Sequence, residues 1–304
     1  MPALPPQPTP DPSPGPARRD HGSGAGDGGP GARLVAVTGA RGGLGASTLL
    51  LHLAWALGRG GWRTAVVDLD PAGGLGMLLG DDVLPGLRWA DLPTQETAFR
   101  AARLVGALPV WHTVSVLTGD ARGGPLVRGD GRLPGCVDAV LTAVAREHEV
   151  VLVDLPRGLP APLSAQVLLL TGRDLPSAVA AEVLVPWLRA SVLGQGAVRS
   201  SGCQDTACVG AGESDPVSLV VRASGEDVTG ADLERITGCR VLGSVPRDRA
   251  VLQRAARGED LVRSRSAMRR AVSALARRLV PGTGTASPSG WQDSVVRREG
   301  QAWQ

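Results

Sequence analysis

The residues of this chain best suited to chemistry form a glycine-rich turn near the N-terminus. The turn reads TGARGGLGAST and runs from Thr38 to Thr48. An apolar stretch precedes it and a helical pattern follows. Its backbone N–H groups can therefore point at an anion, at the end of the helix where the dipole also favours negative charge. This arrangement predicts a phosphate-binding loop without reference to any relative.

Three aspartates end apolar stretches further along the chain. Asp68 and Asp70 close the stretch TAVVDLD (64–70), and Asp154 lies near the end of EVVLVDL (149–155). Residues of this kind are candidates for metal binding or catalysis, but they are also common as helix caps and solvated strand ends. A glycine turn, likewise, sometimes serves only to give the chain a positive φ. The residue types alone leave both interpretations open.

The turn departs from the general P-loop pattern, which has lysine directly before the serine and glycine at position 40. This chain has Ala46 and Ala40 there, and all 32 of its basic residues are arginine. Two unit charges about 4 Å apart, at an effective dielectric near 20, interact by about 4 kcal/mol, and Ala46 contributes none of it. We expect binding to survive on the backbone and the carboxylates, with slow or absent hydrolysis.

The elements that would position these residues follow from the apolar runs. Candidate strands are LVAVT (34–38), TAVVDLD (64–70), TVSVLTG (113–119), EVVLVDL (149–155), QVLLLTG (166–172), SLVVRA (218–223) and RVLGSV (240–245), with helices that include 47–58 and about 176–190. Runs without alternation are typical of strands buried on both faces. We predict an α/β fold with a doubly wound, mainly parallel sheet and helices on both faces, as in P-loop NTPases.

Composition sets the expected domain boundaries. Residues 1–31 and 282–304 are polar and rich in small residues, and such segments bury too little apolar surface to become ordered. We expect a disordered leader and a disordered tail around one domain at 32–281. A stretch rich in Gly, Ser and Cys at 192–216 is expected to be a surface insertion in that domain.

Taken in order, these motifs resemble the MinD/ParA group of deviant P-loop proteins, from about residue 33 to 280. That group has a signature basic residue before a glycine pair, which matches Arg41 before Gly42 and Gly43. Its branch around CpaE, TadZ and the actinobacterial septum-site protein Ssd often has Gly-Ala-Ser where this chain has 45–47. Several motifs in the correct order are more specific than any single glycine loop.

The resemblance implies roles for individual residues. Asp70 would orient the attacking water or the metal and Asp68 would support it, while Ser47 and Asp154 would hold Mg²⁺ through a mostly intact water shell. Arg41 could replace part of the missing lysine charge, within the chain or across a dimer. The residues implied in nucleotide binding are Arg41, Gly42, Gly43, Leu44, Gly45, Ala46, Ser47, Thr48 and, beside the base, Arg222 and Pro246.

The resemblance also implies a function. The chain would be a nucleotide-dependent spatial regulator or scaffold for septum-site placement or for pilus and secretion machinery, and at most a weak ATPase. Its cofactors would be ATP or ADP with Mg²⁺. It would form a homodimer on nucleotide binding and act on a pilus or secretion ATPase or on division proteins, with no specific nucleic acid expected.

The expected location follows from the lack of a long apolar stretch and of an apolar N-terminal leader. No stretch approaches about 18 uninterrupted apolar residues and the N-terminus has no apolar leader, so we expect neither secretion nor a membrane span. The four scattered cysteines fit reduced thiols in a cytoplasm. A peripheral site at the inner membrane face, a pole or the septum is implied by the resemblance. The narrow apolar stripe at Met268, Val272, Leu275 and Leu279 favours a helix that closes the domain over one on a membrane surface.

Two other function classes are weighed against this one. The turn also fits the TGxxxGxG pattern of short-chain dehydrogenases, with Asp68 where a ribose could bind. Their chemistry needs Tyr and Lys, and the chain has neither, so only a dead dinucleotide-binding relative would remain. The other class is a scaffold that binds no nucleotide, which the sequence does not separate from a slow ATPase.

Overall fold

The computed structural model describes residues 31–79, 85–125, 133–194, 215–262 and 266–280. The predicted tail at 282–304, nearly all of the predicted leader and most of the insertion at 192–216 lie outside the described residues. The predicted domain at 32–281 is described except for residues 80–84, 126–132, 195–214 and 263–265 and its last residue.

The described strands form one eight-stranded sheet in the order β3-β4-β2-β5-β1-β6-β7-β8. Neighbouring strands are parallel except β3, which runs antiparallel to β4. Their bounds are β1 Arg33–Gly39, β2 Thr64–Asp68, β3 Val110–Trp111, β4 Val114–Leu117, β5 Val150–Asp154, β6 Gln166–Thr171, β7 Val217–Ala223 and β8 Val241–Pro246. This mainly parallel sheet confirms the predicted fold class.

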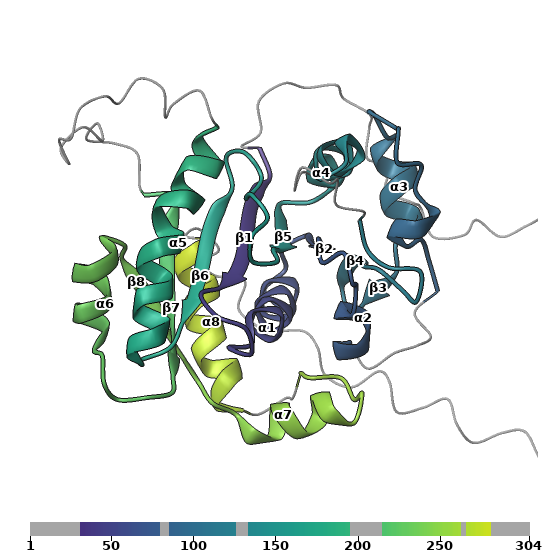
Figure 1. Cartoon of the computed structure of the whole chain (residues 1–304). Helices are drawn as coiled ribbons and strands as arrows, with labels where there is room; N and C mark the ends of the chain where they lie inside the picture. Colours follow the sequence, from purple (N-terminus) through teal and green to yellow (C-terminus); the bar gives the residue numbers. More distant parts are fainter. Residues whose placement is uncertain (1–30, 80–84, 126–132, 195–214, 263–265, 281–304) are drawn as a thin grey trace, which may run out of the picture. The chain divides into compact units, whose positions relative to one another are not determined.

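Both faces of the sheet are covered by helices (Figure 1). One core holds side chains of α3, α4, α5 and α6, and the other holds those of α1 and α8. The helices are α1 Ala46–Arg59, α2 Leu75–Leu78, α3 Ala101–Ala107, α4 Gly135–Glu147, α5 Leu175–Leu193, α6 Gly230–Thr237, α7 Arg249–Ala256 and α8 Ala267–Leu279, with a short 3₁₀ turn at Trp89–Asp91.

The central strands explain why the apolar runs showed no alternation. Along β1, Val35 and Val37 enter the core under α1 and α8, while Ala36 between them enters the other core. In β6, Leu168 and Leu169 divide in the same way. Because successive side chains point to opposite faces and both faces are buried, every position has to be apolar.

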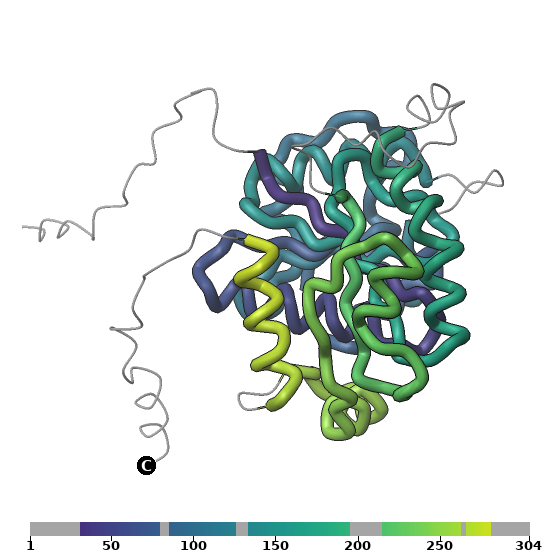
Figure 2. Tube along the Cα trace, turned by 90° about the vertical axis from the view of Figure 1, so that its left-hand side faces the viewer, coloured from purple at the N-terminus to yellow at the C-terminus, as the bar shows by residue number. Residues whose placement is uncertain are grey.

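Helix α8 closes the domain, as the sequence favoured. Its stripe of Met268, Val272, Leu275 and Leu279 is buried. The helix packs against α1 and β8, and Figure 2 shows it in yellow beside the green segments that include β8. This apolar stripe is therefore occupied inside the fold and is not available to a membrane surface.

Helix α5 is long and apolar enough to cross a membrane, judged by length and composition alone, and within the described residues it is the one helix that passes this test. Core helices of soluble proteins pass it too. In the structure Ala178, Ala181 and Val185 of α5 are buried in the core against the sheet. The core therefore accounts for one face of the helix, whereas five large apolar side chains of α5 are exposed: Leu175, Val179, Val183, Trp187 and Leu193.

Two local details differ from the sequence prediction. Strand β2 ends at Asp68 and not at Asp70, because the Asp68 carboxylate accepts a hydrogen bond from the Asp70 backbone N–H (2.9 Å) and turns the chain. The short edge strand β3 was not predicted, since two residues carry no periodic pattern.

The strand order also bears on the dehydrogenase alternative. In Rossmann folds the first two strands of the unit are neighbours. Here β5 lies between β1 and β2. The Asp68 side chain is fully buried and not open to a ribose. Both observations argue against a dinucleotide-binding protein of that class.

Candidate functional site: a phosphate-loop pocket

The glycine-rich turn connects β1 to α1 and leaves the start of α1 open. Gly45 is the N-cap residue, with φ 87° in the left-handed region, and no side chain caps the helix. Gly43 also has a positive φ, 77°. The first N–H groups of an α-helix have no partner within the helix, so this turn presents donors to a ligand. That the turn binds phosphate stays a prediction.

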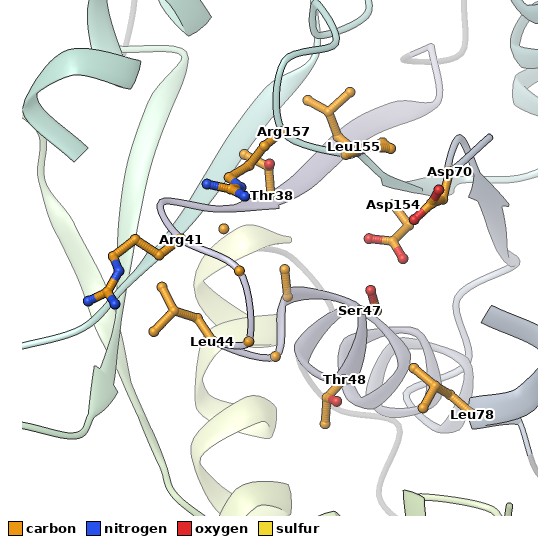
Figure 3. Close-up of a pocket in the computed structure, with 16 residues that line it drawn as sticks. Thr38, Arg41, Leu44, Ser47, Thr48, Asp70, Leu78, Asp154, Leu155 and Arg157 are labelled. Atoms are coloured by element: carbon orange, nitrogen blue, oxygen red, sulfur yellow. The ribbon is translucent and has the colours of Figure 1, made fainter. Parts of the chain in front are cut away.

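A pocket of about 400 Å³ opens in front of this turn (Figure 3). Three segments meet in it: the turn, the chain after β2 and the chain after β5. Its lining residues are Thr38, Gly39, Arg41, Gly42, Gly43, Leu44, Gly45, Ala46, Ser47, Thr48, Asp70, Leu78, Asp154, Leu155, Pro156 and Arg157. The structure thus brings together all the predicted turn residues with Asp70 and Asp154. The site assignments themselves stay predictions.

Asp154 and Asp68 lie opposite one another at the ends of β5 and β2. Burial, together with the neighbouring Asp68, raises the pKa of Asp154 to about 7, and a hydrogen bond donated by the Ser47 hydroxyl offsets only part of this rise. Burial likewise raises the pKa of Asp68 to about 6. Two buried carboxylates side by side favour a proton or a cation between them.

Asp68 and Asp70 occupy different places. Asp68 accepts hydrogen bonds from the Thr118 hydroxyl (2.8 Å) and from the Asp70 N–H, and it lies behind the pocket wall. Asp70 is half-buried and lines the pocket itself. Asp68 is therefore placed to hold the Asp70 turn, whereas Asp70 is placed to meet a ligand.

The carboxylate pair should make stability depend on pH. Both groups ionise near pH 3.8 when unfolded, but at about 6 and about 7 when folded. Between about pH 4 and 7 the folded state holds protons that the unfolded state has lost, so stability falls as pH rises through that window. Denaturant midpoints in chelator from pH 4 to 8 should show this fall, with a shallower slope in Asp154→Asn. Equal slopes in both proteins would contradict the assignment.

Arg41, the predicted signature residue, lies on the pocket rim but points away from the aspartates (Figure 3). Its guanidinium forms an ion pair with Asp174, Nη1 to Oδ1 2.9 Å. Asp174 is also the N-cap of α5 and accepts from the Ser177 N–H (2.9 Å). In this conformation Arg41 adds no positive charge to the interior of the pocket.

Arg222 and Pro246 do not line the pocket. Arg222 is the residue before the last of β7, and Pro246 is the last residue of β8. The Arg222 side chain is buried next to the turn, where a Cβ on Gly45 would lie 3.6 Å from its Nη2. Burial lowers the pKa of Arg222, and Arg247 lowers it further. Arg222 therefore lies behind the turn, near the start of α1, and not inside the pocket.

The pocket residues fit Mg²⁺ and a phosphate ligand. Ser47 and Asp154 offer hard oxygen ligands, which Mg²⁺ prefers, and they already contact one another. Among the described residues no cluster of three or more His, Cys, Asp or Glu side chains could hold a metal alone. Water and phosphate oxygens would have to complete the shell, as is usual for Mg²⁺.

Several lining residues were not predicted as site residues: Thr38, Gly39, Leu78, Leu155, Pro156 and Arg157. Leu155, Pro156 and Arg157 directly follow Asp154, so their sequence position alone could have included them. Leu78 belongs to α2 and has no such signal.

The part of the chain that forms this pocket matches a known protein family. Residues 32–183, half of the chain, match the family model described as cellulose biosynthesis protein BcsQ. The chain belongs to the BcsQ family. The matched part of the BcsQ family model contains the turn, Asp70 and Asp154.

Sequence relatives overlap this chain only in part. It is 40% identical over 164 residues to the uncharacterized protein Rv3660c of Mycobacterium tuberculosis, covering 52% of this chain and 44% of the relative. It is 31% identical over 137 residues to the chromosome partitioning protein ParA of Myxococcus xanthus, covering 42% of this chain and 45% of the relative. The chain thus spans less than half the length of these curated relatives.

Solved structures show that this member of the BcsQ family has the MinD and ParA fold. The MinC:MinD complex of Aquifex aeolicus matches with a TM-score of 0.58 and 16% identity, over 85% of this chain and 100% of that one. The ParA family ATPase of Chlorobium tepidum matches with a TM-score of 0.56 and 16% identity, over 81% of this chain and 98% of that one. At these identities the likeness concerns the fold.

Proposed function

We propose that this protein is a nucleotide-dependent spatial regulator of the CpaE and Ssd type, which binds ATP or ADP with Mg²⁺ and hydrolyses ATP slowly or not at all. The observation that carries the proposal is one pocket in which the glycine-rich turn, Ser47, Asp70 and Asp154 converge while Ala46 replaces the lysine. MinD of Pyrococcus horikoshii, a structure of the same fold, is complexed with Mg-ADP.

Each pocket segment has a part in this proposal. The backbone N–H groups of the turn would bind the phosphates, where the helix dipole adds to the attraction. Ser47 and Asp154 would hold Mg²⁺, which supplies positive charge against the phosphates when bound. Asp70 at the pocket wall would accept a hydrogen bond from a water. Without a lysine at position 46, transition-state charge is stabilised less, and slow turnover follows.

The regulator is proposed to act as a dimer. Arg41 at the pocket rim is held by an exposed ion pair, and such pairs stabilise by at most about 1 kcal/mol. It can therefore turn toward a nucleotide bound by a second copy. MinD of Aquifex aeolicus is found in complex with MinC, so a division protein or a pilus or secretion ATPase is the proposed partner here. The proposed place is the cytoplasm, at the inner membrane face, a pole or the septum.

Light scattering tests this proposal. With ATP and Mg²⁺ the wild type should double its mass, and Arg41→Ala should stay monomeric. Without nucleotide both should be monomers. A wild type that stays monomeric in both conditions would remove the dimer from the proposal.

The alternative is a scaffold that keeps the fold and binds no nucleotide. The observation that favours it is the missing lysine, because Ala46 leaves the turn without its strongest phosphate contact. A scaffold would keep its mass, stability and partner binding unchanged whether or not ATP is added.

A further inference from the structure

The side chains that line this pocket provide a phosphate ligand with no net positive charge. Asp70 and Asp154 both line it, and position 46 carries no lysine. Two arginines line the pocket, Arg41 and Arg157. Since Arg41 is paired with Asp174 and turned outward, the question becomes which group balances the charge of a bound polyphosphate.

Arg157 lies on a short turn that is fixed by hydrogen bonds and by buried side chains on either side. The Leu159 N–H donates to the Pro156 carbonyl (3.3 Å), and Gly158 has φ 88°, as the third position of a type II turn requires. Leu155 and Leu159 on either side are buried, and the Leu155 N–H donates to Val37 of β1 (3.0 Å). The base of Arg157 is thus tied to the strand that leads into the phosphate loop.

The Arg157 side chain extends from this turn back over the phosphate loop (Figure 3). Its Nη2 lies 3.7 Å from the point where a Cβ on Gly42 would stand. Within the described part of the chain Arg157 has no ion-pair partner, in contrast to Arg41. The Arg157 guanidinium thus lies above a row of backbone N–H donors and has no acidic partner. Together these groups can bind a polyphosphate.

We propose that Arg157 supplies the cation that the phosphate loop lacks, by binding the outer phosphates of a nucleoside di- or triphosphate with its guanidinium. This inference rests on the proposed function. It makes the end of β5 provide both the carboxylate for Mg²⁺ and the cation for phosphate. It also predicts that the protein selects ligands by their number of phosphates, because a monophosphate would not reach Arg157.

Calorimetry with Mg²⁺ tests the inference on wild type, Arg157→Ala and Arg157→Lys, with ATP, AMP and inorganic tripolyphosphate as probes. Arg157→Ala should weaken ATP and tripolyphosphate binding by about ten- to a hundredfold, as expected for lost charge-assisted hydrogen bonds, with AMP binding unchanged. The ATP affinity of Arg157→Lys should lie between those of wild type and Arg157→Ala, since lysine keeps the positive charge but lacks the planar guanidinium. Arg103→Ala, an exposed arginine of α3 outside the pocket, is the matched control and should bind like wild type.

The titrations distinguish a failure of the proposed function from a failure of the role proposed for Arg157. If the wild type binds none of the probes, the proposed function fails and the inference with it. If the wild type binds ATP and Arg157→Ala binds it equally well, the proposed function stands and the inference is wrong. The melting temperature of each variant is the check on folding, and because Arg157 is exposed it should not change.

Discussion

Replacing Ala46 with lysine should tighten ATP binding more than any other single change in this chain. Ala46 is the first residue of α1 and lines the pocket beside Ser47. A lysine there would place a positive charge about 4 Å from the phosphates, worth up to about 4 kcal/mol at an effective dielectric near 20. That is an upper limit of roughly a thousandfold in affinity, and ATP turnover should rise as well.

The matched control is Ala46→Met, which adds a side chain of comparable length without the charge. Calorimetry and phosphate release should show the gain only in the lysine variant. If both variants bind ATP alike, the pocket does not hold phosphates in front of the turn and the P-loop interpretation of the site fails.

Gly124→Ala should damage the Asp70 side of the pocket. A Cβ on Gly124 would lie 1.9 Å from the Asp70 carbonyl oxygen, and the Gly124 N–H donates to the Pro71 carbonyl (2.9 Å). The chain after β2 would have to move away and take Asp70 with it. Overpacking of this kind costs about 1–3 kcal/mol. Urea denaturation should show that loss, and ATP binding in the presence of Mg²⁺ should weaken along with it.

Gly106→Ala is the control for this prediction. Gly106 is exposed near the end of α3, and nothing lies within 4 Å of the point where a Cβ on it would stand. Alanine is a better helix residue than glycine by up to about 1 kcal/mol, so this variant should be as stable as wild type or slightly more so. Gly124→Ala with wild-type stability and wild-type ATP binding would show that the Asp70 segment is not fixed by this contact.

The fold was predictable because its determinants are local. Runs such as those around Val35 and Leu168 are apolar at every position, which only a strand buried on both faces requires. The Gly-rich turn and the aspartates at the strand ends then fall on one edge of a parallel sheet. The convergence of Asp154, Asp70 and Ser47 in one pocket follows from that topology.

Side-chain directions were not predictable in the same way. Arg41 meets Asp174, which is 133 residues away in the sequence, through a contact that no local pattern contains. Arg222 stays a prediction for a contact with the base, and no local pattern indicates that its buried side chain packs against Gly45. Arg157 follows the predicted strand directly, yet only the turn around it decides that it extends over the loop. Each of these depends on contacts between distant segments.

The most direct test of the central claim is the calorimetric titration of the wild-type protein with ATP in the presence of Mg²⁺. We predict saturable binding with a dissociation constant well below about 1 mM, which is a free energy stronger than about 4 kcal/mol, and weaker binding by Asp154→Ala. No binding below the millimolar range would contradict it and would show that the chain keeps the MinD and ParA fold as a scaffold alone.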